Sequence, residues 1–237
     1  MKNFRNTVSV VAALLCFAVI RTGFAQQVVI SEVSSVQSDR LLQRPAGAPP
    51  RLGNMPAWHE PQFVEPSFWK SGTGPFGFGY SVATNVSTVV LNKTPSLYLR
   101  RSFSATAAQV ASGVQVELLI NYDDGFVAFL NGVEVARRNT GAAGSYTWHD
   151  QAAFNAKAAG AVETIPLGLA GTLLREGANV LAIQVHNSDV SNTQFFCSAT
   201  LRLGGGTPQS LVLPNNIWRW FAGTQAPSGG LYDGSSE

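Results

Sequence analysis

Short apolar runs, several of them with a polar residue at every second position, recur along the chain between glycine- and proline-containing segments. In residues 114–118 the two valines and the leucine fall on one face of an extended strand. In residues 180–186 the apolar face carries Leu181, Ile183 and Val185, while Gln184 and His186 point the other way. The pattern predicts strands at residues 28–33, 86–91, 97–103, 114–121, 126–130, 133–137, 163–167, 180–186 and 195–203.

Two tight-turn signals, Asp124-Gly125 and Asn131-Gly132, lie close together around one of these strands. Asn-Gly between two apolar runs is a strong sign of a β-hairpin, because a type I′ turn needs positive φ at both central residues. Helical signal is weak, and single turns are expected at residues 105–110 and 169–174. These features predict an all-β fold, an antiparallel β-sandwich with short helical connectors.

The N-terminus has the three parts of a secretory signal peptide. Lys2 and Arg5 form a basic segment, residues 8–20 are apolar but short for a membrane span, and small residues flank the phenylalanine of residues 23–25. We therefore expect residues 1–25 to be removed. The mature protein would be secreted or held at the cell surface, with no membrane span of its own.

Loss of this leader changes both the charge and the cysteine content. Three basic residues and no acidic ones leave with it, so 13 Lys and Arg would remain against 14 Asp and Glu. A nearly neutral chain lacks the basic surface that neutralises phosphates, so nucleic acid is not an expected partner. Cys16 also leaves, and Leu15 before it departs from lipoprotein signals. Cys197 follows Phe195 and Phe196, which predicts a buried, unreactive thiol.

Composition divides the rest of the chain into four segments. Residues 26–62 combine an N-terminal strand with an irregular loop rich in proline, glycine and alanine, and residues 63–203 hold the sandwich strands. Residues 204–209 begin with three glycines, which is typical of a flexible linker. Residues 210–237 contain the run Ile-Trp-Arg-Trp-Phe at 217–221. This segment could pack back on the sandwich, but we expect it to begin a second, incomplete module of a longer multidomain protein.

Four sequence blocks in order resemble one known kind of module. They are Trp-Lys-Ser-Gly-Thr-Gly-Pro-Phe-Gly-Phe-Gly at 69–79, Tyr-Leu-Arg-Arg-Ser-Phe at 98–103, the Asp-Asp-Gly hairpin, and Gly-Ala-Asn-Val-Leu-Ala-Ile-Gln-Val-His-Asn at 177–187. The blocks are similar to the galactose-binding-domain-like jelly rolls of large secreted bacterial proteins. Related sandwiches accompany glycoside hydrolases and esterases as non-catalytic, carbohydrate-binding-module-like domains. The resemblance implies a jelly-roll sandwich over residues 63–203.

Asp123 and Asp124 are adjacent carboxylates at the end of a predicted strand. Calcium takes six to eight oxygen ligands, to which such a pair would contribute. Some sugar-binding adhesin sandwiches carry a similar Asp-Asp-Gly turn that holds calcium and contacts the sugar. The alternative is structural, with Asp124-Gly125 forming a tight turn while Asp123 accepts backbone N–H bonds. Asp123 and Asp124 are thus candidate ligand contacts and candidate calcium ligands, and a structural role stays open.

Other candidate ligand contacts lie at a strand end and beside an aromatic residue. His186, Asn187 and Asp189 follow the strand at 180–186, where sandwiches present ligand contacts, although such residues also suit a solvated turn. Trp148, if exposed beside Tyr146, would stack on a pyranose ring. Burial of Trp148 is the alternative.

No motif predicts catalysis. The sequence has no Gly-x-Ser-x-Gly elbow, and its histidines at 59, 149 and 186 lack zinc spacing. We therefore expect a non-catalytic secreted module that binds carbohydrate or a cell-surface glycan within a larger protein. The alternative is a structural, spacer or adhesion domain that binds no small molecule. Any enzyme activity would belong to a domain outside this chain.

Overall fold

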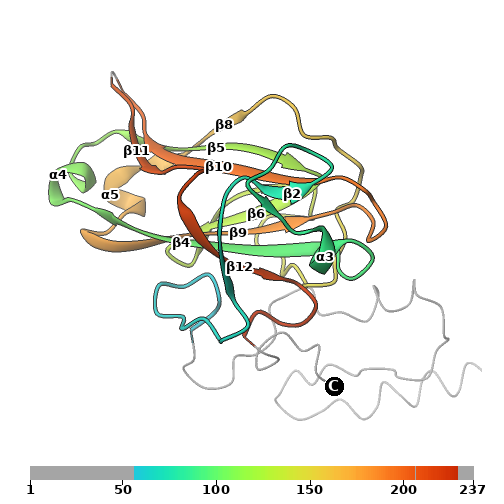
Figure 1. Cartoon of the computed structure of the whole chain (residues 1–237). Coiled ribbons are helices and arrows are strands. Elements are labelled where there is room, and N and C mark those ends of the chain that lie inside the picture. Colours follow the sequence, from blue (N-terminus) through green and yellow to red (C-terminus); the bar gives the residue numbers. More distant parts are fainter. Residues whose placement is uncertain (1–55, 206, 229–237) are drawn as a thin grey trace, which may run out of the picture. The chain divides into compact units, whose positions relative to one another are not determined.

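The computed structural model describes residues 56–205 and 207–228, and these residues form two packed β-sheets (Figure 1). The signal peptide expected at residues 1–25 and the strand expected at 28–33 lie outside the described residues. The first sheet has the antiparallel order β1 (Lys70–Thr73), β12 (Ile217–Ala222), β4 (Ser96–Ala105), β9 (Gly177–His186), β6 (Gly125–Leu130) and β7 (Val133–Arg138). The second has the order β3 (Thr84–Asn85), β2 (Phe76–Phe78), β10 (Phe195–Leu203), β5 (Gln115–Asp123) and β8 (Glu163–Leu169), and β11 (Gln209–Val212) pairs with β10.

The core lies between the two sheets and follows the alternation of the sequence. Val116, Leu118 and Ile120 of β5 are fully buried in it. The apolar face of β9, with Leu181, Ile183 and Val185, belongs to the same cluster. An all-β sandwich is therefore confirmed, and the period-two pattern correctly identified which faces turn inward.

The outer face of the first sheet is covered too, which the half-buried pattern did not predict. A second apolar cluster lies on β4, β9 and β12, and its aromatic members come partly from the segment that precedes β1. This cluster contains Trp58, Phe63, Trp69, Tyr98, Val180, Ala182 and Phe221. Gln184 and His186, on the same side of β9, are also buried rather than solvated.

Arg100 of β4 attaches the preceding segment to this face. Its guanidinium donates to the carbonyl oxygens of Trp58 and Glu60 and pairs with the Glu65 carboxylate at 2.9 Å. It also lies 5.2 Å from the centre of the Phe63 ring. Because these contacts span residues 58–65, the boundary expected at residue 63 falls inside the folded unit.

The hairpin predicted at Asn131-Gly132 is confirmed. Asn131 and Gly132 have φ of 53° and 92°, and Leu130 pairs with Val133 across the turn, as a type I′ hairpin requires. Asp124-Gly125, in contrast, closes no hairpin. Strand β5 pairs with β10 and β8, whereas β6 pairs with β7 and β9, so the chain crosses there from one sheet to the other.

The short helical connectors are confirmed, and one expected strand is a helix instead. Helices α4 (Ala107–Val110) and α5 (Ala170–Leu173) form at the two expected places. Residues 86–91 were expected as a strand because they are rich in valine, but they contain α3 (Ser87–Val90). Val86 and Val90 are both fully buried, and a spacing of four places them on one side of a helical turn.

The expectation of a second module beginning at residue 210 is wrong for the described residues. Strand β12 lies between β1 and β4, and Trp218 and Trp220 belong to the core between the sheets. Gly204 donates its N–H to the Gln115 carbonyl at 2.7 Å, and the chain after it joins the neighbouring strands β10 and β11. The glycine-rich stretch is therefore a connection within the sandwich and not a linker between modules. No helix in the described ranges is long and apolar enough to cross a membrane.

Candidate functional site

Asp124 lies where the chain crosses between the sheets, and its carboxylate is 1% exposed. Its Oδ1 accepts the backbone N–H of Lys157 at 2.5 Å. Its Oδ2 accepts the backbone N–H of Ser188 at 2.7 Å and the side-chain amide of Asn192 at 3.3 Å. The carboxylate therefore joins two loops to the crossing point.

Asp123 is equally buried but has one unsatisfied oxygen. Its Oδ2 accepts the hydroxyl of Tyr80 at 2.6 Å, while Oδ1 has no partner among the described residues. Burial raises the pKa of the Asp123 carboxyl, and the neighbouring charge of Asp124 raises it further, against the Tyr80 hydrogen bond. Burial and the bond to Asp123 raise the pKa of the Tyr80 hydroxyl as well.

The two carboxylates offer little to a calcium ion in this arrangement. Three of their four oxygens already accept hydrogen bonds, which leaves Asp123 Oδ1 against the six to eight oxygens that calcium takes. Within residues 56–205 and 207–228, no group of three or more His, Cys, Asp and Glu is placed to hold a metal. Calcium binding stays a prediction, and its test is given below.

His186 and Asn187 lie next to Asp124 but are closed off from solvent. The backbone N–H of Asp124 donates to the His186 carbonyl at 3.0 Å. His186 Nδ1 lies 2.6 Å from the carbonyl oxygen of Gln151, so Nδ1 carries the proton. Burial lowers the pKa of His186 to about 4, with the charge of Arg137 adding to the shift against the hydrogen bond to Gln151.

Asn187 fixes the loop that follows β9. Its side-chain amide donates to the carbonyl of Gln194 at 3.3 Å, and its own carbonyl accepts the N–H of Ala153 at 2.8 Å. The structure thus brings Asp123, Asp124, His186 and Asn187 together, but as one buried polar cluster. None of the four is exposed enough to contact a ligand from solvent.

The two remaining candidates, Asp189 and Trp148, make other contacts. Asp189 is exposed, and its Oδ1 accepts the N–H and the hydroxyl of Ser191 at 2.7 and 2.6 Å, as in the solvated turn considered above. These bonds lower the pKa of its carboxyl. Trp148 is buried, as in the alternative considered above, with its ring edge-on to Tyr146 at 4.8 Å, so it presents no exposed ring to a sugar.

A cleft that the sequence did not predict lies at the β1 edge of the first sheet, and we call it the aromatic cleft. Its volume is about 280 Å³. Strand β12 contributes Trp220 and Phe221, which are nearly buried, and the segment before β1 contributes the half-buried Phe68. The remaining lining residues are Lys70, Val89, Lys93, Ala222 and Thr224.

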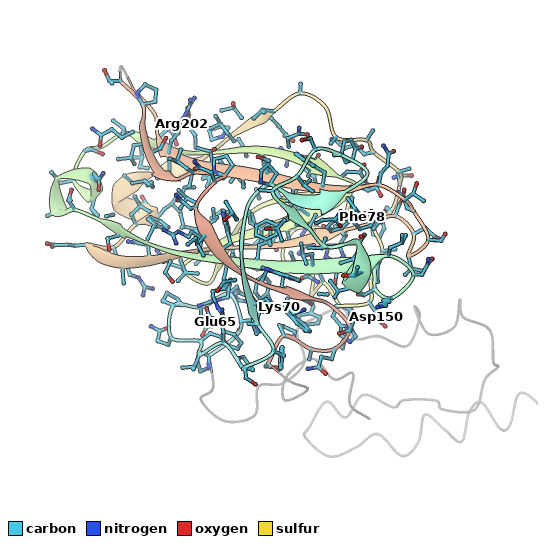
Figure 2. The ribbon with its side chains drawn as sticks, viewed as in Figure 1. Glu65, Lys70, Phe78, Asp150 and Arg202 are labelled. Carbon is cyan, nitrogen blue, oxygen red and sulfur yellow. The ribbon has the colours of Figure 1, made fainter. Side chains whose placement is uncertain are left out.

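Two lysines and a threonine form the polar part of the aromatic cleft, and all three are exposed. Lys70 pairs with Trp220 across β1 and β12, and its Nζ lies 5.2 Å from the centre of the Trp220 ring. Lys93 follows α3 and donates from Nζ to the Thr88 carbonyl at 2.5 Å. In the view of Figure 2, Lys70 lies on the same side of the sandwich as Glu65 and away from Arg202.

Sequence reasoning noted the aromatic run at 217–221 but assigned it to another module. Nothing in the sequence pairs Lys70 with a residue 150 positions later, because strand order depends on the whole fold. The aromatic run itself carries a pattern that indicates a strand of this sandwich. Alternate residues of β12, Trp218 and Trp220, face the core while Phe221 faces the outer cluster, which is the pattern of a strand buried on both faces.

A second cleft of about 360 Å³ lies at the other end of the sandwich, by α4. Its polar lining is neutral and includes Gln109, Ser112 and Gln209. No aromatic or charged side chain among the described residues lines it, and residue 206 beside it is not described. The aromatic cleft is therefore the better candidate for a binding site.

No protein-family model matches this sequence, and no curated protein matches it. Among solved structures, the chain is similar to an α-L-rhamnosidase of Streptomyces avermitilis complexed with L-rhamnose, at 15% identity and a TM-score of 0.36. That match covers 76% of this chain and 14% of the rhamnosidase. An α-L-rhamnosidase of Aspergillus terreus matches at 13% identity and a TM-score of 0.30, over 49% of this chain and 13% of that one.

A lectin of Pleurotus ostreatus, in its apo form, is similar at 15% identity and a TM-score of 0.32. The match covers 82% of this chain and 44% of the lectin. The chain thus spans less than half the length of each of these proteins. Likeness at such TM-scores supports no statement about function, so the case for a function rests on the chain's own residues.

Proposed function

We propose that this chain is a non-catalytic β-sandwich module that binds carbohydrate, on a glycan or a polysaccharide, through the aromatic cleft. The observation that carries the proposal is the composition of that cleft. Phe68, Trp220 and Phe221 line a hollow whose exposed polar residues are two lysines and a threonine.

This combination suits a sugar ring for a physical reason. A pyranose presents C–H groups on one face and hydroxyls around its edge, so it binds best where an aromatic surface meets a few polar groups. Small-molecule sites commonly occupy roughly 300–1,000 Å³. At about 280 Å³ the aromatic cleft lies at the lower limit, which favours one sugar unit or a chain end over a long stretch of polysaccharide.

The state of the acidic residues supports a non-catalytic role. Glycosidases cleave with two carboxylates placed on opposite sides of the scissile bond. Asp123 and Asp124 are adjacent and buried, and three of their oxygens are bound by groups of the protein itself. The eight residues that line the aromatic cleft include no carboxylate. Export directed by residues 1–25 is part of the proposal, because it would bring the module to extracellular glycans.

The test begins with a glycan array probed with the mature chain, residues 26–237, followed by calorimetric titration of any glycan that binds. Phe68→Ala should weaken binding roughly three- to tenfold, since a ring contact contributes about 0.5–1.5 kcal/mol. Phe154→Ala is the matched control, because Phe154 is 65% exposed and does not line the cleft.

Thermal unfolding of both variants separates a lost contact from a lost fold. Equal loss of binding in the two variants, or binding that is unaffected by Phe68→Ala, would remove the aromatic cleft from the account. If no glycan binds the folded mature chain, the spacer or adhesion alternative takes its place.

A further inference from the structure

We infer that the carbohydrate taken by the aromatic cleft is acidic, and that Lys70 and Lys93 bind its carboxylate or sulfate group. This inference rests on the proposed function and adds the ligand's chemical class to it. It starts from the charges of the cleft. Two of the eight lining residues are cationic, none is anionic, and both lysines are exposed to solvent.

The positive charge of the two lysines is uncompensated within the described part of the chain, where no carboxylate lies within 4.0 Å of either ammonium group. Glu65, the acidic residue nearest to Lys70 in the sequence, pairs instead with Arg100 at 2.9 Å and lies 4.0 Å from Arg219. The cleft therefore presents two ammonium groups that still have donor capacity. An anionic ligand would neutralise charge that the protein leaves unpaired.

Both ammonium groups are held in place before any ligand arrives. Lys93 Nζ donates to the Thr88 carbonyl, which leaves it two further N–H groups, and Lys70 Nζ lies over the Trp220 ring. Holding long side chains in this way reduces the entropy lost when they bind an anion. The nearby rings favour an anion carried on a sugar over a small inorganic ion, because inorganic ions offer no apolar face to the rings.

The shared chemistry is a saccharide that carries an anionic oxygen group, and its source can be a uronic acid or a sulfate ester. The probes are therefore trigalacturonate, the neutral galactotriose of the same linkage, and the same galactotriose carrying sulfate. Each is titrated calorimetrically into the mature chain at low and at physiological ionic strength. We expect at least one acidic probe to bind about tenfold more tightly than the neutral one, and to weaken as salt screens the contact.

Charge variants then test the lysines. Lys70→Gln and Lys93→Gln should each weaken the acidic probe by about two- to fivefold, and the double variant by about tenfold, with little effect on the neutral probe. Lys93→Arg keeps the charge and should retain the preference. Arg175→Gln is the matched control: it removes one exposed positive charge at the C-terminal end of α5, and Arg175 does not line the cleft.

The outcomes separate this inference from the proposed function. Equal affinity for acidic and neutral probes, unchanged in the double variant, would overturn the acidic ligand and leave glycan binding standing. An acidic preference that Arg175→Gln reduces as much as Lys93→Gln would reflect net charge and would also overturn it. Failure of every saccharide to bind would end both the proposed function and the inference built on it.

Discussion

Asp124 lies at the point where the chain leaves one sheet for the other, and its two oxygens accept hydrogen bonds from Lys157, Ser188 and Asn192. These donors come from two loops that are far apart in the sequence. A charged acceptor of this kind contributes about 1.5–3 kcal/mol for each good hydrogen bond, and its loss leaves backbone N–H groups buried without a partner. The residue therefore stabilises this end of the sandwich.

Replacing Asp124 with asparagine should lower the free energy of unfolding by about 2–4 kcal/mol, because one of the two acceptor oxygens becomes an N–H₂ group facing a donor. Urea denaturation measures the change. Asp189→Asn is the matched control from the loop that also carries Ser188 and Asn192: Asp189 is exposed, and no measurable change is expected. Comparable stability of the two variants would contradict a structural role for Asp124.

His186 predicts a loss of stability in mild acid. The pKa of its imidazole is about 4 in the folded protein and near 6.5 in the unfolded chain. Between these two pH values the imidazole is protonated in the unfolded chain and neutral in the folded protein. Stability from this group is full above pH 6.5 and falls as the pH drops towards 4, by about 3 kcal/mol in all.

The measurement is urea denaturation between pH 7 and pH 4 for the natural chain and for His186→Gln. The pKa of the Asp123 carboxyl is raised above its ordinary value of 3.8, so the contribution of Asp123 to stability grows as the pH falls. The contribution of His186 is therefore obtained from the difference between the two proteins. Parallel curves for the two proteins would show that His186 does not sense pH.

Single residues show what local sequence can and cannot predict. The Asn131-Gly132 turn was predictable because its conformation depends on two neighbours alone. Cys197 is buried, as its apolar neighbours suggested, and burial raises the pKa of its thiol to about 12. The buried state of His186 and Asn187 was not predictable, because loops from other parts of the chain cover them.

At the scale of elements, β12 belongs to the first sheet, so the folded unit includes residues 217–222. It pairs with β4 through residues 219–222 and with β1 through residues 217–220. Trp218 is 2% exposed in the core, whereas its neighbour Ile217 is 62% exposed. The two side chains provide an internal comparison, since they are adjacent in sequence and point in opposite directions.

Trp218→Ala should lower the free energy of unfolding of the sandwich by about 3–5 kcal/mol, the usual cost of deleting a buried aromatic side chain. Ile217→Ala, the control, should stay within about 0.5 kcal/mol of the natural chain. Thermal or urea unfolding of the full chain tests both. If Trp218→Ala left the main transition unchanged, residues 217–222 would belong to a separate unit after all.

Long strands with alternating apolar and polar residues, such as β5 and β9, were predictable from the sequence. Short strands were missed because three or four residues carry no readable period. Strand β1, for example, is Lys-Ser-Gly-Thr and contains no large apolar residue. Its place in the sheet comes from pairing with β12, so the candidate site built on that pair could not be predicted either.

At the scale of the whole molecule, thermal stability tests whether calcium binds at Asp123 and Asp124. If calcium binds at Asp123 and Asp124, removing it with EDTA should lower the melting temperature, and added calcium should restore it. Asp124→Ala should abolish that response, and an unchanged melting temperature on chelation would contradict calcium binding at this pair. Differential scanning calorimetry with and without EDTA makes the comparison.

The central claim is that the molecule binds saccharide at the aromatic cleft, between β12, α3 and the segment before β1. The most direct measurement is a ¹H–¹⁵N NMR titration of the mature chain with its best saccharide. The account predicts that the largest shifts fall on the amides of Lys70, Val89, Lys93 and Thr224 and on the Trp220 indole. Shifts gathered at residues 187–192 or around Gln109, or no shifts at saturating saccharide, would contradict it.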